Sequence, residues 1–352
     1  MRHQRYSNGY SWICEFIAKA MSHLRQNVIT KDWVIFATER AKRPHEFARS
    51  LEEMPPDSPI YKHNCPFCKG NENPEEAEYL RIEDERGWRV RIIPNKYPAL
   101  SPIGERIRHS EGIHRSITGV GYHEVLIEHP DHNATIALME INDVINILKG
   151  YRQRYLVISQ DKRIESIIIF KNHGESAGTS LEHPHSQITA TPVVPSQIRY
   201  RLIEATNYFD DMGECLFCHT LRDELNAEER IVLETEHFVT FMPYAALSPF
   251  HMWVFPRRHR SCFSDITDAE ITDLAYTLKT VLAKLYYGLN NPAYNFTIRS
   301  MPTDETQSDY FHWYLAIVPR VSKAAGFELG SGMYINTAMP EDSAKFLREV
   351  EV

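Results

Sequence analysis

Hydrophobic side chains follow two different spacings along the 352 residues of this chain. The uninterrupted apolar run at residues 167–170 predicts a buried strand. Two other segments repeat apolar residues every three or four positions, which is the spacing of an amphipathic helix. The repeating residues are Val144, Ile145, Leu148, Tyr151 and Tyr155 in the first segment, and Ile271, Leu274, Leu278, Val281, Leu282 and Leu285 in the second. Thr267 and Glu270 form a capping box at the predicted start of the second helix.

The two helices occupy equivalent places in a repeated order of elements. Each copy contains a Cys-x-x-Cys pair, a proline-bearing segment, a strand that leads to a histidine, the helix, and two further strands. The last two strands are predicted at residues 164–170 and 183–191 in the first copy, and at 294–299 and 312–318 in the second. This order predicts an α+β fold of two tandem copies, with a mostly antiparallel sheet, a long helix in each copy and a shared core.

The repeat places the predicted domain boundaries at residues 21–200 and 201–352. Residues 1–20 look unlike the rest of the chain. We expect them to be a disordered or non-native extension, or else an N-terminal helix that contains Trp12, Phe16 and Ile17.

Composition and charge narrow the functional classes. The formal net charge of −8 argues against a protein that binds nucleic acid through a basic surface, although a nucleotide ligand needs only a few local cations. No apolar run approaches 18 residues, so we expect no membrane span. The N-terminus lacks the apolar core of a signal peptide, and we therefore expect the protein in the cytoplasm.

The paired cysteines predict two metal sites. In a cytosolic protein a Cys-x-x-Cys pair favours metal over a disulfide, and it supplies half of a tetrahedral zinc shell. The predicted zinc ligands are Cys65, Cys68, His132 and His183 in the first copy, and Cys215, Cys218, His259 and His312 in the second. Both sites would be closed and structural. His251 and His219 are alternatives to His259, and a redox dithiol is the alternative for each cysteine pair.

The spacing of the histidines suggests how the two copies correspond. Fifty-three residues separate His132 from His185, and 53 also separate His259 from His312. On this register His312 corresponds to His185, and Tyr310 takes the place of His183. The second copy then has one histidine where the first has two, so we expect the first copy to be catalytic and the second structural.

The stretch between Asn172 and Gln187 carries the candidate chemistry. A loop of small residues, whose backbone N–H groups could bind phosphate oxygens, leads to His183, His185 and Gln187 on one face of an extended segment. With His183 on the metal, a neutral His185 is free to attack the α-phosphorus of a nucleoside diphosphate compound and form a covalent phosphoramidate. Its other ring nitrogen then needs an acceptor such as a backbone carbonyl. Gln187 could donate its amide to a phosphate oxygen.

A second polar cluster contains Arg40 and Arg43. These arginines are three positions apart, so in a helical turn they would share a face and could clamp phosphate groups.

Together these motifs resemble the galactose-1-phosphate uridylyltransferase family, a branch of the histidine-triad superfamily built from two fused copies. The resemblance extends from about residue 24 to residue 352 and rests on residues 40–44, 65–68, 130–132 and 183–187. It implies that His185 carries the nucleotidyl group, that Gln187 contacts the phosphate, and that the protein is a cytosolic homodimer. It also implies a nucleotide and phosphate site lined by Arg40, Arg43, Asn95, Asn172 and Ser180.

The C-terminal half resembles the branch related to ADP-glucose phosphorylases, because of its second cysteine pair and the tail at residues 326–336. Uridylyltransferases place a glutamate that recognises the hexose where this chain has Gly332. The predicted reaction moves UMP from UDP-glucose to a hexose 1-phosphate by a ping-pong mechanism through nucleotidyl-His185. The alternative is an ADP-glucose-type phosphorylase that uses inorganic phosphate.

Two further classes remain as rivals, a histidine-triad nucleotidyl hydrolase and a zinc-dependent binding module without enzymatic activity. Gln187 favours a transferase over a hydrolase, because an amide cannot protonate a leaving group or activate water.

Overall fold

The computed structural model describes residues 22–37, 43–44, 46–47, 58–303 and 307–352. The segment predicted as an extension, residues 1–20, and the candidate Arg40 lie outside these residues. Among the described residues, no helix has both the length and the apolar character needed to span a membrane.

Each copy contributes five strands and one long helix to the body of the molecule. In the first copy these are β3 (Leu80–Asp84), β4 (Gly87–Pro94), β7 (Tyr122–Ile127), α3 (Ile141–Ile158), β8 (Ser166–His173) and β9 (His185–Thr191). In the second copy they are β10 (Ile231–Glu234), β11 (Phe238–Phe241), β12 (Met252–Pro256), α6 (Asp268–Gly288), β13 (Tyr294–Arg299) and β14 (Tyr314–Pro319).

These ten strands form one sheet in the order β10-β11-β12-β14-β13-β8-β9-β7-β4-β3. All neighbours in it pair antiparallel, and β8 of the first copy pairs directly with β13 of the second. Counting outward from this central pair, the strands of both halves follow the same order within their copies. The predicted α+β fold with tandem copies is confirmed, and the copies are joined into a single sheet.

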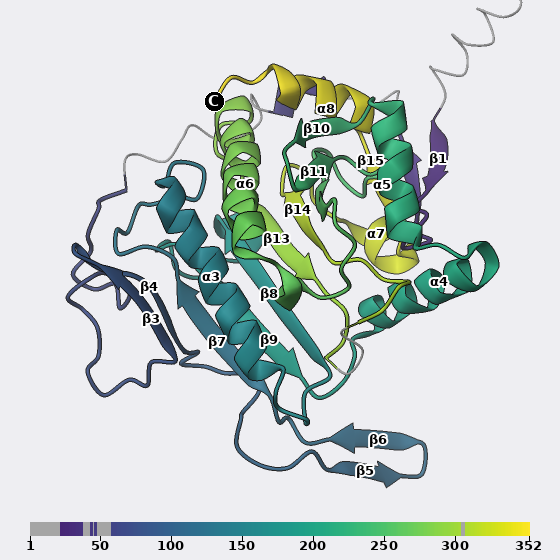
Figure 1. The fold of residues 1–352 in the computed structure, drawn as a ribbon. Helices are drawn as coiled ribbons and strands as arrows, with labels where there is room; N and C mark the ends of the chain where they lie inside the picture. Colours follow the sequence, from purple (N-terminus) through teal and green to yellow (C-terminus); the bar gives the residue numbers. More distant parts are fainter. Residues whose placement is uncertain (1–21, 38–42, 45, 48–57, 304–306) are drawn as a thin grey trace, which may run out of the picture.

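The two long helices lie side by side on one face of this sheet (Figure 1). One hydrophobic core runs beneath them through both copies, with Leu148 of α3, Ile169 of β8, Leu278 of α6 and Phe296 of β13 all buried. The predicted helical spacing is confirmed, and Thr267 and Glu270 form the expected capping box at the start of α6. The shared core explains why the copies form one body.

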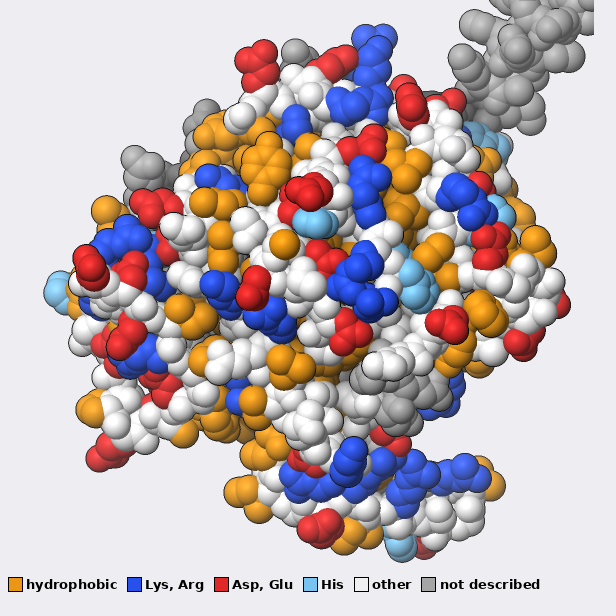
Figure 2. Space-filling model, viewed as in Figure 1, with side chains coloured by type: hydrophobic (Ala, Val, Ile, Leu, Met, Phe, Trp, Pro, Cys, Tyr) orange, Lys and Arg blue, Asp and Glu red, His pale blue; other side chains and the backbone are white. Residues whose placement is uncertain are grey.

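The remaining elements surround this body. They are β1 (His23–Gln26), β2 (Trp33–Phe36), β5 (Arg108–Glu111), β6 (His114–Ile117), α4 (Ser196–Met212), α5 (Leu216–Ala227), α7 (Gly326–Ser331), β15 (Tyr334–Asn336) and α8 (Pro340–Glu349), with short 3-10 turns at Glu175–Ala177 and Phe263–Asp265. Strand β15 pairs with β2, so the C-terminal tail meets the first two strands that the structure describes. The β5–β6 hairpin projects from the body, and Figure 2 shows Lys and Arg side chains along it.

Candidate functional site

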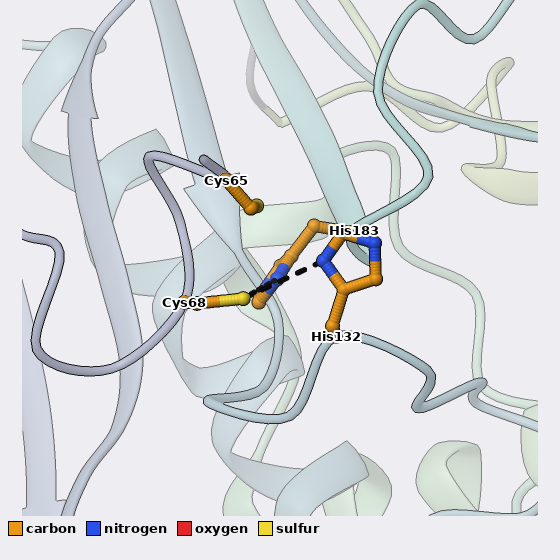
Figure 3. Close-up of side chains that lie close together, drawn as sticks. All are labelled: Cys65, Cys68, His132 and His183. Atoms are coloured by element: carbon orange, nitrogen blue, oxygen red, sulfur yellow. Dashed lines mark hydrogen bonds between the residues drawn. The ribbon is translucent and has the colours of Figure 1, made fainter. Parts of the chain in front are cut away.

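Four side chains from distant parts of the first copy meet in one cluster. Cys65 and Cys68 lie in a turn, His132 lies in the loop after β7, and His183 lies just before β9 (Figure 3). One ligand atom from each of the four lies within 4.8 Å of the others. The Cys68 Sγ is 3.5 Å from Nδ1 of His132 and 3.6 Å from Nδ1 of His183. Two thiols and two imidazole nitrogens are a donor set that suits zinc.

The outer nitrogens of both histidines are also held in place. The Nε2 of His183 lies 2.8 Å from the carbonyl oxygen of His129, and the Nε2 of His132 lies 3.4 Å from a carboxylate oxygen of Glu182. Such contacts fix the ring so that Nδ1 faces the cluster. Burial lowers the pKa of His183 to about 4, which keeps its imidazole in the neutral form that binds metal.

A second cluster lies in the second copy. Cys215, Cys218 and His259 offer ligand atoms within 4.8 Å of one another. The Cys218 Sγ is 3.2 Å from Nδ1 of His259 and 3.4 Å from Nδ1 of His312. Here the cysteines do not lie in a tight turn, because Cys215 precedes α5 and Cys218 lies in its first turn. Both clusters could therefore hold a metal ion; the first brings together all four predicted residues, and the second brings together Cys215, Cys218 and His259, with His312 next to Cys218.

The geometry corrects the predicted correspondence between the copies. His312 faces Cys218, the second cysteine of its pair, as His183 faces Cys68 in the first copy. His312 is therefore equivalent to His183 and not to His185. The strands agree, since β9 begins at His185 and β14 begins at Tyr314, each two residues after a cluster histidine. Tyr314 thus takes the place of His185. The equal 53-residue spacing gave the wrong correspondence because the second copy has two more residues between its cluster histidines than the first copy has.

His185 is the first residue of β9 and is buried. Its Nδ1 lies 2.9 Å from the carbonyl oxygen of His183, which therefore accepts a hydrogen bond from Nδ1–H and leaves Nε2 as the unprotonated nitrogen. Burial lowers the pKa of His185, so the neutral form is favoured near neutral pH. The backbone acceptor expected from the sequence is thus the carbonyl oxygen of His183, which is itself a cluster residue.

The position of His185 is fixed on both sides of the sheet. The Phe67 ring makes edge-on contacts with the ring of His183, a cluster residue, and with the ring of His185, at centroid distances of 5.9 and 5.8 Å. On the helix side, the buried Lys171 Nζ donates to the His185 carbonyl oxygen at 3.3 Å and to Glu128 Oε2 at 2.6 Å. The first residue of β9 therefore has little freedom to move.

Gln187 lies two residues farther along β9 and is half-buried. Its Oε1 is 2.7 Å from Nε2 of His123, a residue of β7. The Nδ1 of His123 accepts the backbone N–H of Ala99 at 3.1 Å, so its proton is on Nε2 and is donated to Gln187. With its oxygen engaged, the Gln187 amide has its N–H groups left to donate to a ligand. His123 is thus a functional candidate that the sequence analysis did not identify.

The other predicted ligand-binding residues differ in their surroundings. Asn172 Oδ1 accepts from Asn295 Nδ2 of β13 at 2.8 Å, and continuing the β8–β9 register sets Asn172 opposite His185. Asn95 lies next to the hydrogen-bonded pair of His123 and Gln187, because its Nδ2 is 3.2 Å from His123 Nε2. Ser180 is exposed. Arg43 is also exposed, and its side chain makes no hydrogen bond or ion pair within the described part of the chain.

The loop before His183 is already partly hydrogen-bonded to itself. The N–H groups of Ala177 and Gly178 bond to the carbonyl oxygens of Gly174 and Glu175, so they are not available to a phosphate as the sequence suggested. Gly174 has φ +81°, and a Cβ there would lie 2.7 Å from the Cβ of Ala293, just before β13. This loop therefore packs closely against the second copy.

Two family models cover most of the sequence. The N-terminal domain of galactose-1-phosphate uridyl transferase matches residues 14–195, and its C-terminal domain matches residues 202–350. The chain belongs to this family. The resemblance noted from the sequence motifs is therefore confirmed, and the family is one of nucleotidyltransferases.

Curated relatives and solved structures of the family cover nearly the whole chain. ADP-glucose phosphorylase of Arabidopsis thaliana is 40% identical over 94% of this chain and 93% of its own length. Galactose-1-phosphate uridylyltransferase of Thermotoga maritima is 29% identical over 94% of this chain and 99% of its own. A crystal structure of an Arabidopsis thaliana ADP-glucose phosphorylase with bound ADP-glucose matches with a TM-score of 0.79 and 37% identity, covering 94% of this chain and 99% of that one.

Proposed function

We propose that this family member is an ADP-glucose-type phosphorylase. His185 Nε2 attacks the α-phosphorus of the nucleotide sugar, the bond from that phosphorus to the bridging oxygen breaks, and glucose 1-phosphate leaves. Inorganic phosphate then attacks the phosphorus of nucleotidyl-His185 and releases ADP together with free histidine. The reaction needs no redox partner, and each step replaces one bond to phosphorus with another.

The hydrogen bond between His185 Nδ1 and the His183 carbonyl oxygen carries this proposal. It supports Nε2 as the nucleophilic nitrogen, and the lowered pKa of His185 supports the neutral state that nucleophilic attack requires. Gln187, whose oxygen is held by His123, would direct its amide N–H groups to a phosphate oxygen as charge develops.

The relatives favour this alternative over the UDP-glucose reaction that the sequence analysis put first. The Arabidopsis thaliana ADP-glucose phosphorylase is 40% identical, whereas the Thermotoga maritima uridylyltransferase is 29% identical. Gly332 supports the same choice, because it follows α7 with φ +72°, a conformation that a hexose-binding glutamate would rarely adopt. Transfer of UMP to a hexose 1-phosphate remains the second candidate.

The proposal also covers the metal sites, the assembly of the protein and the residues that line the ligand site. Each cluster would bind one structural zinc ion, with His312 as the fourth ligand of the second site. The protein would act as a cytoplasmic homodimer on a nucleotide sugar and phosphate. Arg40, Arg43, Asn95, Asn172 and Ser180 would line the ligand site.

Intact-mass measurement after incubation with ADP-glucose or UDP-glucose tests the proposal. We expect an AMP adduct on the wild-type chain and none on His185→Ala, because the nitrogen that forms the adduct is removed. Inorganic phosphate should discharge the adduct and yield ADP. A UMP adduct discharged only by hexose 1-phosphate would instead identify the uridylyltransferase. The absence of an adduct with both donors would refute covalent catalysis on these substrates.

A further inference from the structure

The second copy places a cluster of basic side chains where the first copy has its candidate catalytic site. Tyr314 takes the place of His185, and Arg299 of β13 lies directly opposite Tyr314 in the sheet. In the first copy the residue opposite His185 is Asn172, by the continued β8–β9 register. Directly opposed residues of an antiparallel pair project from the same face with neighbouring Cβ atoms. Arg299 therefore occupies the position of the first copy's Asn172.

Arg299 has an unusual electrostatic environment. Its side chain forms no hydrogen bond or ion pair with any other residue that the structure describes. Burial lowers the pKa of Arg299, Tyr314 opposes this shift, and the charge of Arg201 on α4 adds to it. Arg299 is half-buried, and a cation held near a like charge is stabilised when an anion joins it.

Arg201 shares this shortage of partners. Its Nη1 donates only to the carbonyl oxygen of Gln197 in its own helix, at 2.7 Å. Its Nε is buried and has no hydrogen-bond partner. Within the described residues, no carboxylate forms an ion pair with Arg201 or Arg299. The two guanidinium groups therefore present donors that this part of the protein does not satisfy.

His251 completes the cluster. It is buried, and its Nδ1 accepts the backbone N–H of Leu247 at 3.4 Å, so its proton is on Nε2. Burial, followed by the charges of Arg299 and Arg201, lowers the pKa of His251 to about 3. The imidazole is therefore neutral and can donate a hydrogen bond without adding to the local positive charge.

We propose that the second copy binds an oxyanion of phosphate size between Arg299 and Arg201, beside His251 and Tyr314. Guanidinium groups bind phosphate oxygens through paired, charge-assisted hydrogen bonds, and an anion here would neutralise two like charges. The ligand would be inorganic phosphate or the phosphate group of a sugar phosphate or nucleotide. Because Tyr314 replaces the histidine nucleophile, this site would bind its anion without chemistry.

Thermal unfolding of the full-length, metal-loaded chain in a chloride buffer tests this site, with separate additions of inorganic phosphate, glucose 1-phosphate and AMP. Ligand that binds only the folded state raises Tm, and near-saturating ligand should raise it by about 3–5 °C. We expect Arg299→Met and Arg201→Met each to lose at least half of the rise. Arg115→Met, on the exposed β5–β6 hairpin, is the matched control and should keep all of it.

The three additions and the first-copy variants separate the possible outcomes. A rise with inorganic phosphate identifies the free anion as sufficient, whereas a rise only with AMP or glucose 1-phosphate identifies a phosphate ester. His185→Ala should retain the component of the rise that depends on Arg299, which distinguishes this site from the proposed catalytic one. An equal rise in wild type, Arg299→Met and Arg201→Met would overturn the proposal, whether or not the proposed function holds.

Discussion

The two copies use the same scaffold, but their equivalent positions carry different chemistry. Where the first copy has His185 and Gln187 on β9, the second has Tyr314 and Ala316 on β14. Val125 pairs with Gln187 and Trp253 pairs with Ala316, so His123 of the first copy corresponds to His251 of the second. Both copies retain a cysteine–histidine cluster next to the start of the strand.

The surroundings of the two strands differ as much as their side chains. In the second copy, α5 covers this face of the sheet, and Tyr314 packs against the rings of Phe217, Trp253 and Phe255. In the first copy Gln187 remains half-buried on the corresponding face. The comparison shows that the cluster and the sheet can be kept without the candidate catalytic residues, so metal content and catalysis should be separable by mutation.

The largest expected difference is between His185→Ala and Tyr314→Phe. Loss of the proposed nucleophile should reduce the release of glucose 1-phosphate from ADP-glucose by at least about 10³-fold. The Tyr314→Phe exchange removes only a hydroxyl at the equivalent position and should change the rate by less than about threefold. Steady-state rates measure both. A comparable loss in Tyr314→Phe would show that the second copy takes part in the reaction.

The next difference concerns the two clusters. With one zinc ion in each cluster, as proposed, Cys65→Ser and Cys215→Ser should each reduce the zinc content from two ions per chain to one, because each would remove a thiolate ligand. Cys65→Ser should also lower activity by about 10–100-fold, since His183 then loses the anchor that positions His185. Metal analysis and rates on the same samples provide the test. Equal activity losses in the two variants would contradict the division of roles.

A smaller effect is expected from the histidines of β7 and β12. His123→Phe removes the donor that orients Gln187, and we expect kcat to fall by about 10-fold with little change in KM. His123→Asn retains an N–H donor and should recover part of this loss. His251→Phe is the matched change in the second copy and should leave kcat unaltered. A fall in stability without any change in kcat would mean that His123 has only a structural role.

Helical spacing predicted the two long helices, and the cysteine pairs indicated both clusters, because these patterns are short-range, although each cluster also takes histidines from distant parts of the chain. Helices α3 and α6 have strongly periodic apolar faces, whereas α4 buries only Ile198 and Ala205 along 17 residues and leaves little periodicity to detect. The correspondence between His185 and His312 was wrong because insertions in connecting segments change spacing without moving the strands. The hydrogen bond from His123 to Gln187 joins residues 64 positions apart, and no local pattern reports it.

The smallest expected effect comes from the helix starts, where the copies differ again. Helix α6 has the Thr267–Glu270 capping box, whereas Glu140 before α3 makes no side-chain cap hydrogen bond. Burial alone would raise the pKa of Glu270, but hydrogen bonds from Arg258 and Thr267 outweigh it and lower the pKa to about 2. A carboxylate with a lowered folded-state pKa adds stability above its ordinary pKa of 4.5, and that stability is lost as the pH falls towards 2.

Glu270→Gln should therefore lower the free energy of unfolding at pH 7 by about 1 kcal/mol, a value reduced for solvent screening of the partly exposed Arg258. The deficit relative to wild type should shrink between pH 4.5 and pH 3, because the wild type loses its charged interaction there while the variant has none to lose. Glu140→Ala should change stability by less than about 0.5 kcal/mol. Denaturant unfolding at several pH values measures these differences. A deficit that stays constant down to pH 3 would show that shape and not charge makes the Glu270 cap stabilising, and the two helix starts would then differ for another reason.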